Sequence, residues 1–357
     1  MEDFVKSVIS SSSQQDYRQP SGGDEELKIA VVGCGGGGNN TVNRIKKLGV
    51  KGAELYVCNT DRAHLSIIDD GIHKILIGKA LTKGLGAGGY PEVGRKAAEQ
   101  SREEIIKNLE GTNLLFLCAG MGGGTGTGAA PVVAQVAKEM GAIVIAMVTY
   151  PFALERARLQ KADQGIADLR KYADSVIILD NNRLAQIVPN LPMNQAFLVA
   201  DEILAKAISG LVFTIKQPSL VNIDFADVRA IMGGGDVGFI SVGSGKGPNK
   251  VDDAVKGVLE NRLLDVDFDG AKGAILHIAG GADLTLGDAI GAGERITDKM
   301  SASASVKWGA RIVPEYDGKL EICAIVTGVK SPQIAGRAFD ESAKKKKGQF
   351  DDIEVVG

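Results

Sequence analysis

The sequence predicts an α/β fold: a parallel β-sheet covered by helices, joined by a long central helix to a second, smaller α/β domain. Two observations support this. Short apolar runs alternate with longer amphipathic runs along most of the chain, and a long proline-free stretch separates the first set of runs from the second. With 357 residues, 44% of them apolar, the chain is long enough for two domains of about 100–200 residues each.

The first domain is predicted to span residues 27–192. Its short runs have the length of strands and are apolar on both faces, as expected for a parallel sheet buried on both sides; they lie at 27–32, 53–58, 73–77, 113–119, 142–149 and 174–179. Helical patterns fall between most of them, at 91–109, 128–140 and 155–172. This alternation places helices on both faces of the sheet.

Residues 193–216 are predicted to form one helix, because apolar side chains recur along a stretch without proline. A helix of this length is more than a crossover and can link two domains. The second domain is predicted over 217–330, with strands and helices at 237–242, 250–262, 273–279, 285–300, 303–308 and 320–327. The remaining ends, 1–26 and 331–357, are predicted to be a flexible N-terminal tail and a C-terminal extension with a flexible tail.

Composition argues against several classes of function. A net charge of −3 removes the bulk electrostatic argument for nucleic-acid binding, and no apolar run approaches the roughly 18 residues of a membrane span. The cysteines lie far apart without a CxxC pair, and no basic-then-apolar leader opens the chain, so we expect reduced packing residues in a cytosolic protein: Cys34, Cys58, Cys118 and Cys323. The three histidines are scattered, so we expect no zinc site.

Three glycine-rich turns follow predicted strands: the first at 33–40 (GCGGGGNN), the second at 119–131 (AGMGGGTGTGAAP) and the third at 84–89 (GLGAGG). Glycine lets the backbone approach an anion closely, and the amides at the start of the next helix attract phosphate. Thr125 and Thr127 add hydroxyl donors. These turns are predicted to converge on one polyphosphate; the alternative is three tight turns that merely need positive φ angles.

Other nucleotide motifs compete with this interpretation. Gly33, Gly35 and Gly38 satisfy GxGxxG, and Asp61 is a candidate ribose ligand of a dinucleotide, although the segment 59–61 is equally suited to capping a helix. No GxxxxGK[ST] loop is present. Residues 249–252 match the guanine-reading NKxD motif, but without that loop Asn249 is better explained as a helix cap.

The segments GGGTGTG (122–128), GCGGGGNN (33–40) and NIDFAD (222–227) resemble the FtsZ branch of the tubulin superfamily. The resemblance covers about residues 27–330, with further agreement at 59–61, 84–89, 151–155, Asn181 and 199–201. It implies a GTPase that polymerises head-to-tail in the cytokinetic ring, with GTP or GDP and Mg²⁺ as cofactors and the mid-cell cytoplasm as its location.

The resemblance also assigns residues. Phosphate binding falls to the first and second glycine turns, through Gly35, Gly36, Gly37, Gly38, Asn39, Asn40, Gly123, Gly124, Thr125, Gly126, Thr127 and Gly128. The γ-phosphate would be enclosed by Ala87, Gly88 and Gly89, and Asp61 is included among the nucleotide ligands. Glu155 would bind ribose, Asn181 the guanine edge, and Asp201 the guanine or its vicinity.

Three positions depart from the family pattern. Leu159 stands where an arginine usually follows the ribose-binding glutamate, and Arg158 is our substitute, with Arg156 also nearby. Asp180 replaces a proline before Asn181, and Tyr90 replaces an asparagine after the third glycine turn. These departures suggest a divergent paralogue and raise an archaeal one as a candidate.

Asn222, Asp224 and Asp227 match the loop that completes the active site of the neighbouring subunit, and the two carboxylates are suited to orienting water and accepting its proton. Their structural alternative is the N-cap and N3 positions of a short helix. A polymer-forming GTPase is therefore the first hypothesis. The second is a nucleotide-binding regulator or scaffold with little hydrolysis.

The C-terminal tail carries four lysines (344–347) and then an acidic and apolar stretch, 350–356. It is predicted to tether the protein to a membrane-anchoring division adaptor, the role that the resemblance implies for such peptides. A solvated end of the chain is the alternative.

Overall fold

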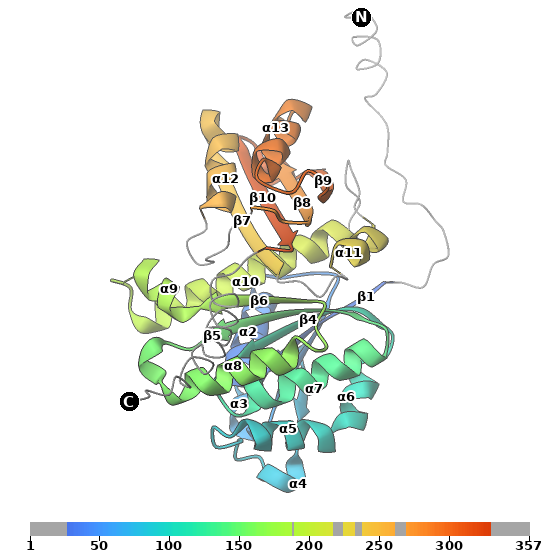
Figure 1. Cartoon of the computed structure of the whole chain (residues 1–357), viewed down its shortest axis with the longest axis vertical. Helices are drawn as coiled ribbons and strands as arrows, with labels where there is room; N and C mark the ends of the chain where they lie inside the picture. Colours follow the sequence, from blue (N-terminus) through green and yellow to red (C-terminus); the bar gives the residue numbers. More distant parts are fainter. Residues whose placement is uncertain (1–26, 188, 217–223, 233–237, 261–268, 330–357) are drawn as a thin grey trace, which may run out of the picture.

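The computed structural model describes residues 27–187, 189–216, 224–232, 238–260 and 269–329. Two sheets stand on either side of the helix α10 (Met193–Lys216), which has the bounds that the sequence predicts. A helix of this length spans about 36 Å. The predicted fold class, a parallel-sheet domain joined by a central helix to a smaller α/β domain, is confirmed (Figure 1).

The larger sheet has six parallel strands in the order β3-β2-β1-β4-β5-β6. All six lie within two residues of their predicted positions: β1 (Lys28–Cys34), β2 (Glu54–Asn59), β3 (His73–Leu76), β4 (Thr112–Gly120), β5 (Ile143–Tyr150) and β6 (Ser175–Asp180). The chain order reverses direction between β1 and β4. In open α/β sheets, ligands bind beyond the carboxyl ends of the strands at such a reversal.

Helices cover both faces of this sheet. One face packs against α2 (Gly35–Lys47), α3 (Arg62–Ser66) and α10. The other packs against α5 (Pro91–Gln100), α6 (Arg102–Leu109), α7 (Thr125–Glu139) and α8 (Ala157–Leu169). The short elements α4 (Lys79–Thr82), η1 (Ala153–Glu155) and α9 (Asn181–Ile187) lie in the connections.

Some helix boundaries differ from the prediction. The expected helix at 91–109 is interrupted at Ser101, whose backbone leaves the helical region (φ −104°, ψ 17°) and whose hydroxyl accepts a hydrogen bond from the Gly78 amide at 2.9 Å. The helix α2 begins inside the first glycine turn, at Gly35, and α7 begins at Thr125 rather than at 128. The first and second glycine turns are therefore partly the first turns of their helices.

The smaller sheet has the order β7-β10-β8-β9, with β8 and β9 parallel and the other pairs antiparallel. Its strands are β7 (Gly238–Lys246), β8 (Gly273–Gly280), β9 (Ser305–Ile312) and β10 (Lys319–Thr327). The helices α12 (Lys250–Leu259) and α13 (Leu286–Thr297) cover one face. The remaining elements here are α11 (Phe225–Met232), η2 (Gly247–Asn249) and η3 (Pro314–Tyr316). Asn249 stands at the N-cap position of α12, as predicted, although its side chain forms no cap hydrogen bond.

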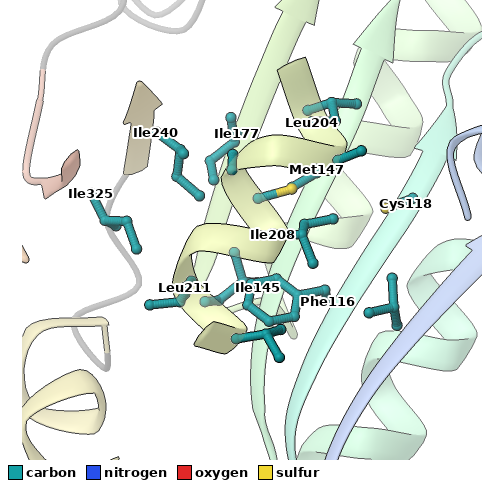
Figure 2. Close-up of a cluster of buried hydrophobic side chains, with 14 of the residues drawn as sticks. Phe116, Cys118, Ile145, Met147, Ile177, Leu204, Ile208, Leu211, Ile240 and Ile325 are labelled. Atoms are coloured by element: carbon teal, nitrogen blue, oxygen red, sulfur yellow. The ribbon is translucent and has the colours of Figure 1, made fainter. Parts of the chain in front are cut away.

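A single apolar cluster connects the two sheets through α10 (Figure 2). Leu204, Ile208 and Leu211 of α10 lie in the same cluster as Phe116 and Ile145 of the larger sheet, and as Ile240 and Ile325 of the smaller one. All seven side chains are buried. The packing of α10 against both sheets fixes where each end of this helix lies relative to the larger sheet.

All four cysteines are buried and free of disulfides, which agrees with their predicted role in packing. Across the part of the chain that the structure describes, no helix is both long enough and apolar enough to cross a membrane.

Candidate nucleotide-binding site

A pocket of about 1150 Å³ opens beyond the carboxyl ends of β1, β2, β4 and β5, at the position where the strand order reverses. The predicted site residues on its wall are Gly36, Gly37, Asp61, Ala87, Gly88, Gly89, Gly123, Gly124, Thr125, Gly126, Glu155, Arg158 and Asn181. All three glycine turns therefore reach one cavity. Its volume is of the size that a drug-sized or cofactor-sized ligand fills.

The first two glycine turns interlock through their backbones. A Cβ on Gly35, whose φ is +70°, would lie 2.7 Å from the Gly126 nitrogen, and one on Gly126 would lie 2.6 Å from the Gly120 carbonyl oxygen. Next to them, the hydroxyls of Thr60 and Thr125 are hydrogen-bonded at 2.7 Å. The close approach of the two backbones therefore requires glycine at both positions 35 and 126.

Not every predicted nucleotide ligand lies on the pocket wall. Gly35, Gly38, Asn39, Asn40, Thr127, Gly128 and Asp201 are absent from it. A Cβ on Gly38 would lie 2.1 Å from the Cys118 carbonyl oxygen, so the backbone packing itself requires glycine there. The Thr127 hydroxyl accepts a hydrogen bond from the Gly122 amide at 2.9 Å and so shapes the turn from behind.

Asn39 also acts from behind the wall. It is fully buried, and its hydrogen-bond partners assign the amide orientation: the nitrogen donates to the Gly33 and Gly35 carbonyls at 2.9 Å each, and the oxygen accepts from Asn59 at 3.2 Å. Asn59 itself lines the pocket. Asn39 therefore ties the end of β2 to the first glycine turn.

Asn40 and Asp201 line a separate pocket of about 360 Å³ on the other side of this turn. The Asp201 carboxylate accepts a hydrogen bond from the Thr41 hydroxyl at 2.7 Å. Burial raises the pKa of Asp201 above its ordinary value, although the Thr41 hydrogen bond and the Arg44 charge oppose the shift. Asp201 therefore holds α10 against α2.

The third glycine turn is held by α8. A Cβ on Gly124 would lie 2.8 Å from the Ala87 Cβ, so this turn packs against the second one. Lys161 of α8 donates a hydrogen bond to the Gly89 carbonyl at 2.6 Å, and its ammonium lies 5.4 Å from the centre of the Tyr90 ring. The tyrosine that departs from the family pattern therefore forms a cation–π contact beside this turn.

Glu155 and Arg158 lie on the pocket wall as an ion pair at 2.6 Å, whereas Leu159 and Arg156 are not on the wall. The other oxygen of Glu155 accepts a hydrogen bond from the Phe152 amide at 3.1 Å. Arg158 is thus the arginine that reaches the cavity near Glu155. Its substitution for the arginine expected at position 159 stays a prediction, supported by this placement.

The far end of the pocket is apolar, which sequence reasoning missed. Phe152 and Phe197 meet edge to face with ring centres 6.1 Å apart, and Leu184, Ala196 and Asn181 lie on the same wall. An apolar slot with one amide is suited to a purine base. In the sequence, Phe152 is marked only by the matching segment 151–155, and Phe197 is one apolar residue among those of the central helix.

Asp180, one of the departures from the family pattern, contacts the start of α9. The Asp180 carboxylate accepts hydrogen bonds from both the amide and the side chain of Asn182, at 2.8 and 2.7 Å, so it shapes the start of α9 where a proline is usual.

His64, a second residue that sequence reasoning missed, lines the pocket beside Gly36. Asp61 caps α3 by accepting from the His64 amide at 3.2 Å, so the capping alternative is observed although Asp61 also lines the pocket.

Asp224 and Asp227 do not lie at this pocket. They belong to α11, at the opposite end of α10 from α9 and Asn181 (Figure 1). Asp224 accepts a hydrogen bond from the Asp227 amide at 2.7 Å, which is the predicted N-cap and N3 arrangement. Asn222, the third predicted member of this group, lies outside the described residues.

This pocket is suited to a Mg²⁺ ion only when a polyphosphate supplies most of the metal's ligands. The described residues contain no group of three or more His, Cys, Asp or Glu side chains placed to hold a metal ion. The wall does carry Asp61, and one oxygen of this carboxylate is engaged with α3. Because Mg²⁺ is usually held by one or two carboxylates together with substrate phosphates, the pocket is suited to a metal that arrives with a polyphosphate.

The fold and this pocket define a class of protein: an α/β nucleotide-binding protein whose phosphate-facing turns are rich in glycine and lack the lysine of a P-loop. Residues 28–189 match the model of the GTPase domain of the Tubulin/FtsZ family, and residues 236–330 match that of the FtsZ family C-terminal domain. The chain belongs to the FtsZ family, and its GTPase domain implies that it binds a guanine nucleotide.

Known relatives agree over nearly the whole chain. "Cell division protein FtsZ 2" of Methanocaldococcus jannaschii is 55% identical over 94% of this chain and 88% of its own length. "Cell division protein FtsZ 2" of Halobacterium salinarum is 48% identical over 99% and 91%. A solved FtsZ dimer from M. jannaschii has a TM-score of 0.80 at 36% identity, covering 100% of this chain and 98% of that one.

Proposed function

We propose that this chain is a GTP-dependent, filament-forming protein of the cell-division ring and that it hydrolyses GTP where one subunit meets the next. One observation carries the proposal. The pocket wall includes Asn181 and Phe197 near the α9 end of α10, whereas the carboxylates belong to the α11 segment. Figure 1 shows α9 and α11 at opposite ends of α10. The carboxylates of one chain are therefore suited to acting on the nucleotide of its neighbour, and such a contact propagates into an open filament.

In this proposal the pocket holds GTP through separate contacts. The amides of the first two glycine turns receive the phosphates, and the turn at 87–89 encloses the γ-phosphate. Glu155 and Arg158 bind the ribose side, and Asn181 reads the guanine edge next to the slot formed by Phe152 and Phe197. A bound Mg²⁺ would neutralise negative charge on the phosphates, and Asp61 is a carboxylate of the pocket wall that would help to hold it.

The hydrolytic step needs a water molecule and a base. The water oxygen forms a bond to the γ-phosphorus, and the bond from that phosphorus to the β–γ bridging oxygen breaks, so GDP leaves with this oxygen. The water proton passes to a carboxylate of the adjoining subunit, Asp224 or Asp227, and inorganic phosphate is the second product. Loss of the γ-phosphate removes contacts from the turn at 87–89, which weakens the subunit contact after hydrolysis.

A second candidate function is a nucleotide-binding regulator or scaffold with little hydrolysis. It is supported by the contacts that charged groups of the pocket already make within the chain. Arg158 is paired with Glu155, and Asp61 caps α3. A protein of this kind would bind GTP tightly and turn it over slowly at any protein concentration.

The two candidates are distinguished by GTP turnover per subunit measured over a range of protein concentrations. A shared active site requires turnover per subunit to rise with concentration and then reach a plateau, in step with the fraction of protein that sediments as filaments. The Asn181→Ala variant, assayed at a GTP concentration well below its own dissociation constant, serves as the binding-deficient control here and in the mixing experiments below. Constant turnover across the range, with filaments present, would overturn the shared-site proposal.

The proposal also includes the protein's location and its other partner. The sequence of the tail, with four lysines followed by an acidic and apolar stretch, is suited to docking on a membrane-anchoring adaptor of the division ring in the cytoplasm at mid-cell. These residues lie outside those that the structure describes.

A further inference from the structure

A lysine of the smaller sheet contacts one of the two α11 carboxylates. Lys307 lies on β9, and its ammonium is 2.8 Å from Oδ1 of Asp227, with side-chain exposures of 47% and 23% respectively. The Asp227 hydrogen bond, followed by the charges of Asp227 and Asp224, raises the pKa of Lys307 above its ordinary value. Lys307 therefore stays charged at neutral pH and faces both carboxylates.

The backbone of Lys307 is fixed by contacts of β9 with its neighbours, although β9 is an edge strand. Its backbone is in register with Ile275 of β8. Four residues further along β9, the guanidinium of Arg311 stacks on the Phe213 ring of α10 at 3.6 Å. The strand that carries Lys307 is thus anchored to the same helix whose two ends are the nucleotide pocket and α11.

The pair contributes little to the stability of the fold, because an exposed ion pair is screened by solvent and has to order a long side chain. The ion pair matters more for the orientation of the Asp227 side chain than for the stability of the fold. A carboxylate that orients water across a subunit contact must be held in one rotamer, and small misplacements of a catalytic group slow a reaction severely. Asp224 is held in a different way, because one of its oxygens accepts a hydrogen bond from the Asp227 amide.

We infer that Lys307 is a positioning residue: it holds the Asp227 carboxylate of its own subunit in the orientation in which that carboxylate acts on the nucleotide of the next subunit. This inference rests on the proposed function, because it takes Asp227 to be catalytic. The contact also offsets one negative charge where two carboxylates approach a triphosphate, and like charges brought together in an interface are unfavourable.

The test compares Lys307→Met with Lys307→Arg, and uses Lys256→Met as the matched control. Lys256 is an exposed lysine of α12 in a loose ion pair with Glu260 at 3.9 Å, far along the chain from α11. Lys307→Met should lower GTP turnover per sedimented subunit by roughly tenfold, less than the hundredfold or more that a positioned general base contributes. GTP affinity, sedimentation and thermal unfolding should stay at wild-type values. Lys307→Arg should recover most of the turnover, and Lys256→Met should lose none.

Mixing two variants shows whether the loss of turnover in Lys307→Met comes from the subunit that supplies Asp227 or from the one that binds GTP. Lys307→Met subunits mixed with Asn181→Ala subunits should hydrolyse more GTP than the two proteins do separately, because the Asn181→Ala subunit offers an intact Lys307 and Asp227 to its neighbour's nucleotide. Lys307→Met mixed with the double variant Asn181→Ala/Lys307→Met should show no such gain.

Each outcome has a separate meaning. Full turnover by Lys307→Met while Asp227→Ala is inactive would overturn this inference and leave the proposed function standing. Full turnover by Asp227→Ala would overturn the catalytic assignment and this inference with it. A loss of turnover that follows a loss of sedimentation would make Lys307 an interface contact and would also overturn the positioning role.

Discussion

The two ends of α10 differ in the groups they offer. The α9 end opens on a pocket lined mainly by glycine backbone and apolar side chains, whose carboxylates Glu155 and Asp61 are engaged with Arg158 and with α3. The α11 end has two carboxylates and Lys307 but no share of that pocket. Each end therefore has what the other lacks, which is the arrangement that the shared-site proposal requires.

The largest expected effect is at the α11 end. Replacing Asp224 or Asp227 by alanine should reduce hydrolysis by roughly a hundredfold or more, because a positioned base is lost, while GTP affinity stays nearly unchanged. Turnover and nucleotide binding are measured on the same preparations. Asp224→Asn is the matched control for capping, since asparagine caps a helix as well as aspartate does.

The same variants test whether the two ends belong to different subunits. Asp224→Ala protein mixed with Asn181→Ala protein should recover part of the lost activity, because one competent contact can form between them. If activity returns only when both residues are intact in one chain, the assignment of the two ends to different subunits is wrong.

The next largest effect concerns the glycine turns at the pocket end. Gly38→Ala should destabilise the fold by about 1–3 kcal/mol, as overpacking does, because the new Cβ would lie 2.1 Å from the Cys118 carbonyl oxygen. Gly123→Ala is the control: it lies on the pocket wall with no atom within 4 Å of a built Cβ. Denaturant unfolding should separate the two variants, and equal stability would contradict the backbone-packing explanation.

A smaller effect is expected from Asn181→Ala. The loss of one hydrogen-bonded contact to the base should weaken GTP binding by roughly tenfold. Binding of inorganic triphosphate, which has no base, should not change. Competition against a fluorescent guanine nucleotide measures both, and equal competition by ATP and GTP would show that Asn181 does not select the base.

The smallest effect is expected from the tail, which belongs to neither end. Deleting residues 340–357 should leave turnover and filament sedimentation close to full-length values, while recruitment to the membrane in cells is lost. A truncated protein that no longer assembles would refute the view of the tail as a tether.

The sequence predicted the strands better than the site. Runs such as 113–119 are apolar on both faces, and this local pattern is enough to place a buried parallel strand. The break at Ser101 depends on a hydrogen bond to Gly78, and the packing of Phe197 against Phe152 depends on residues far apart in the chain, so neither has a local signal. Asp201 and Asn40 matched a motif, yet the packing of α10 on α2 places them on a different cavity. The roles of the residues on the pocket wall stay predictions.

The cluster shared by the two sheets also has a consequence for folding. Because Ile240 and Ile325 lie in the same cluster as Phe116 and Ile145, neither sheet can lose its packing without exposing apolar surface on the other. The two sheets should therefore melt together as one cooperative unit, and the amides at the middle of α10 should exchange with solvent only through global unfolding.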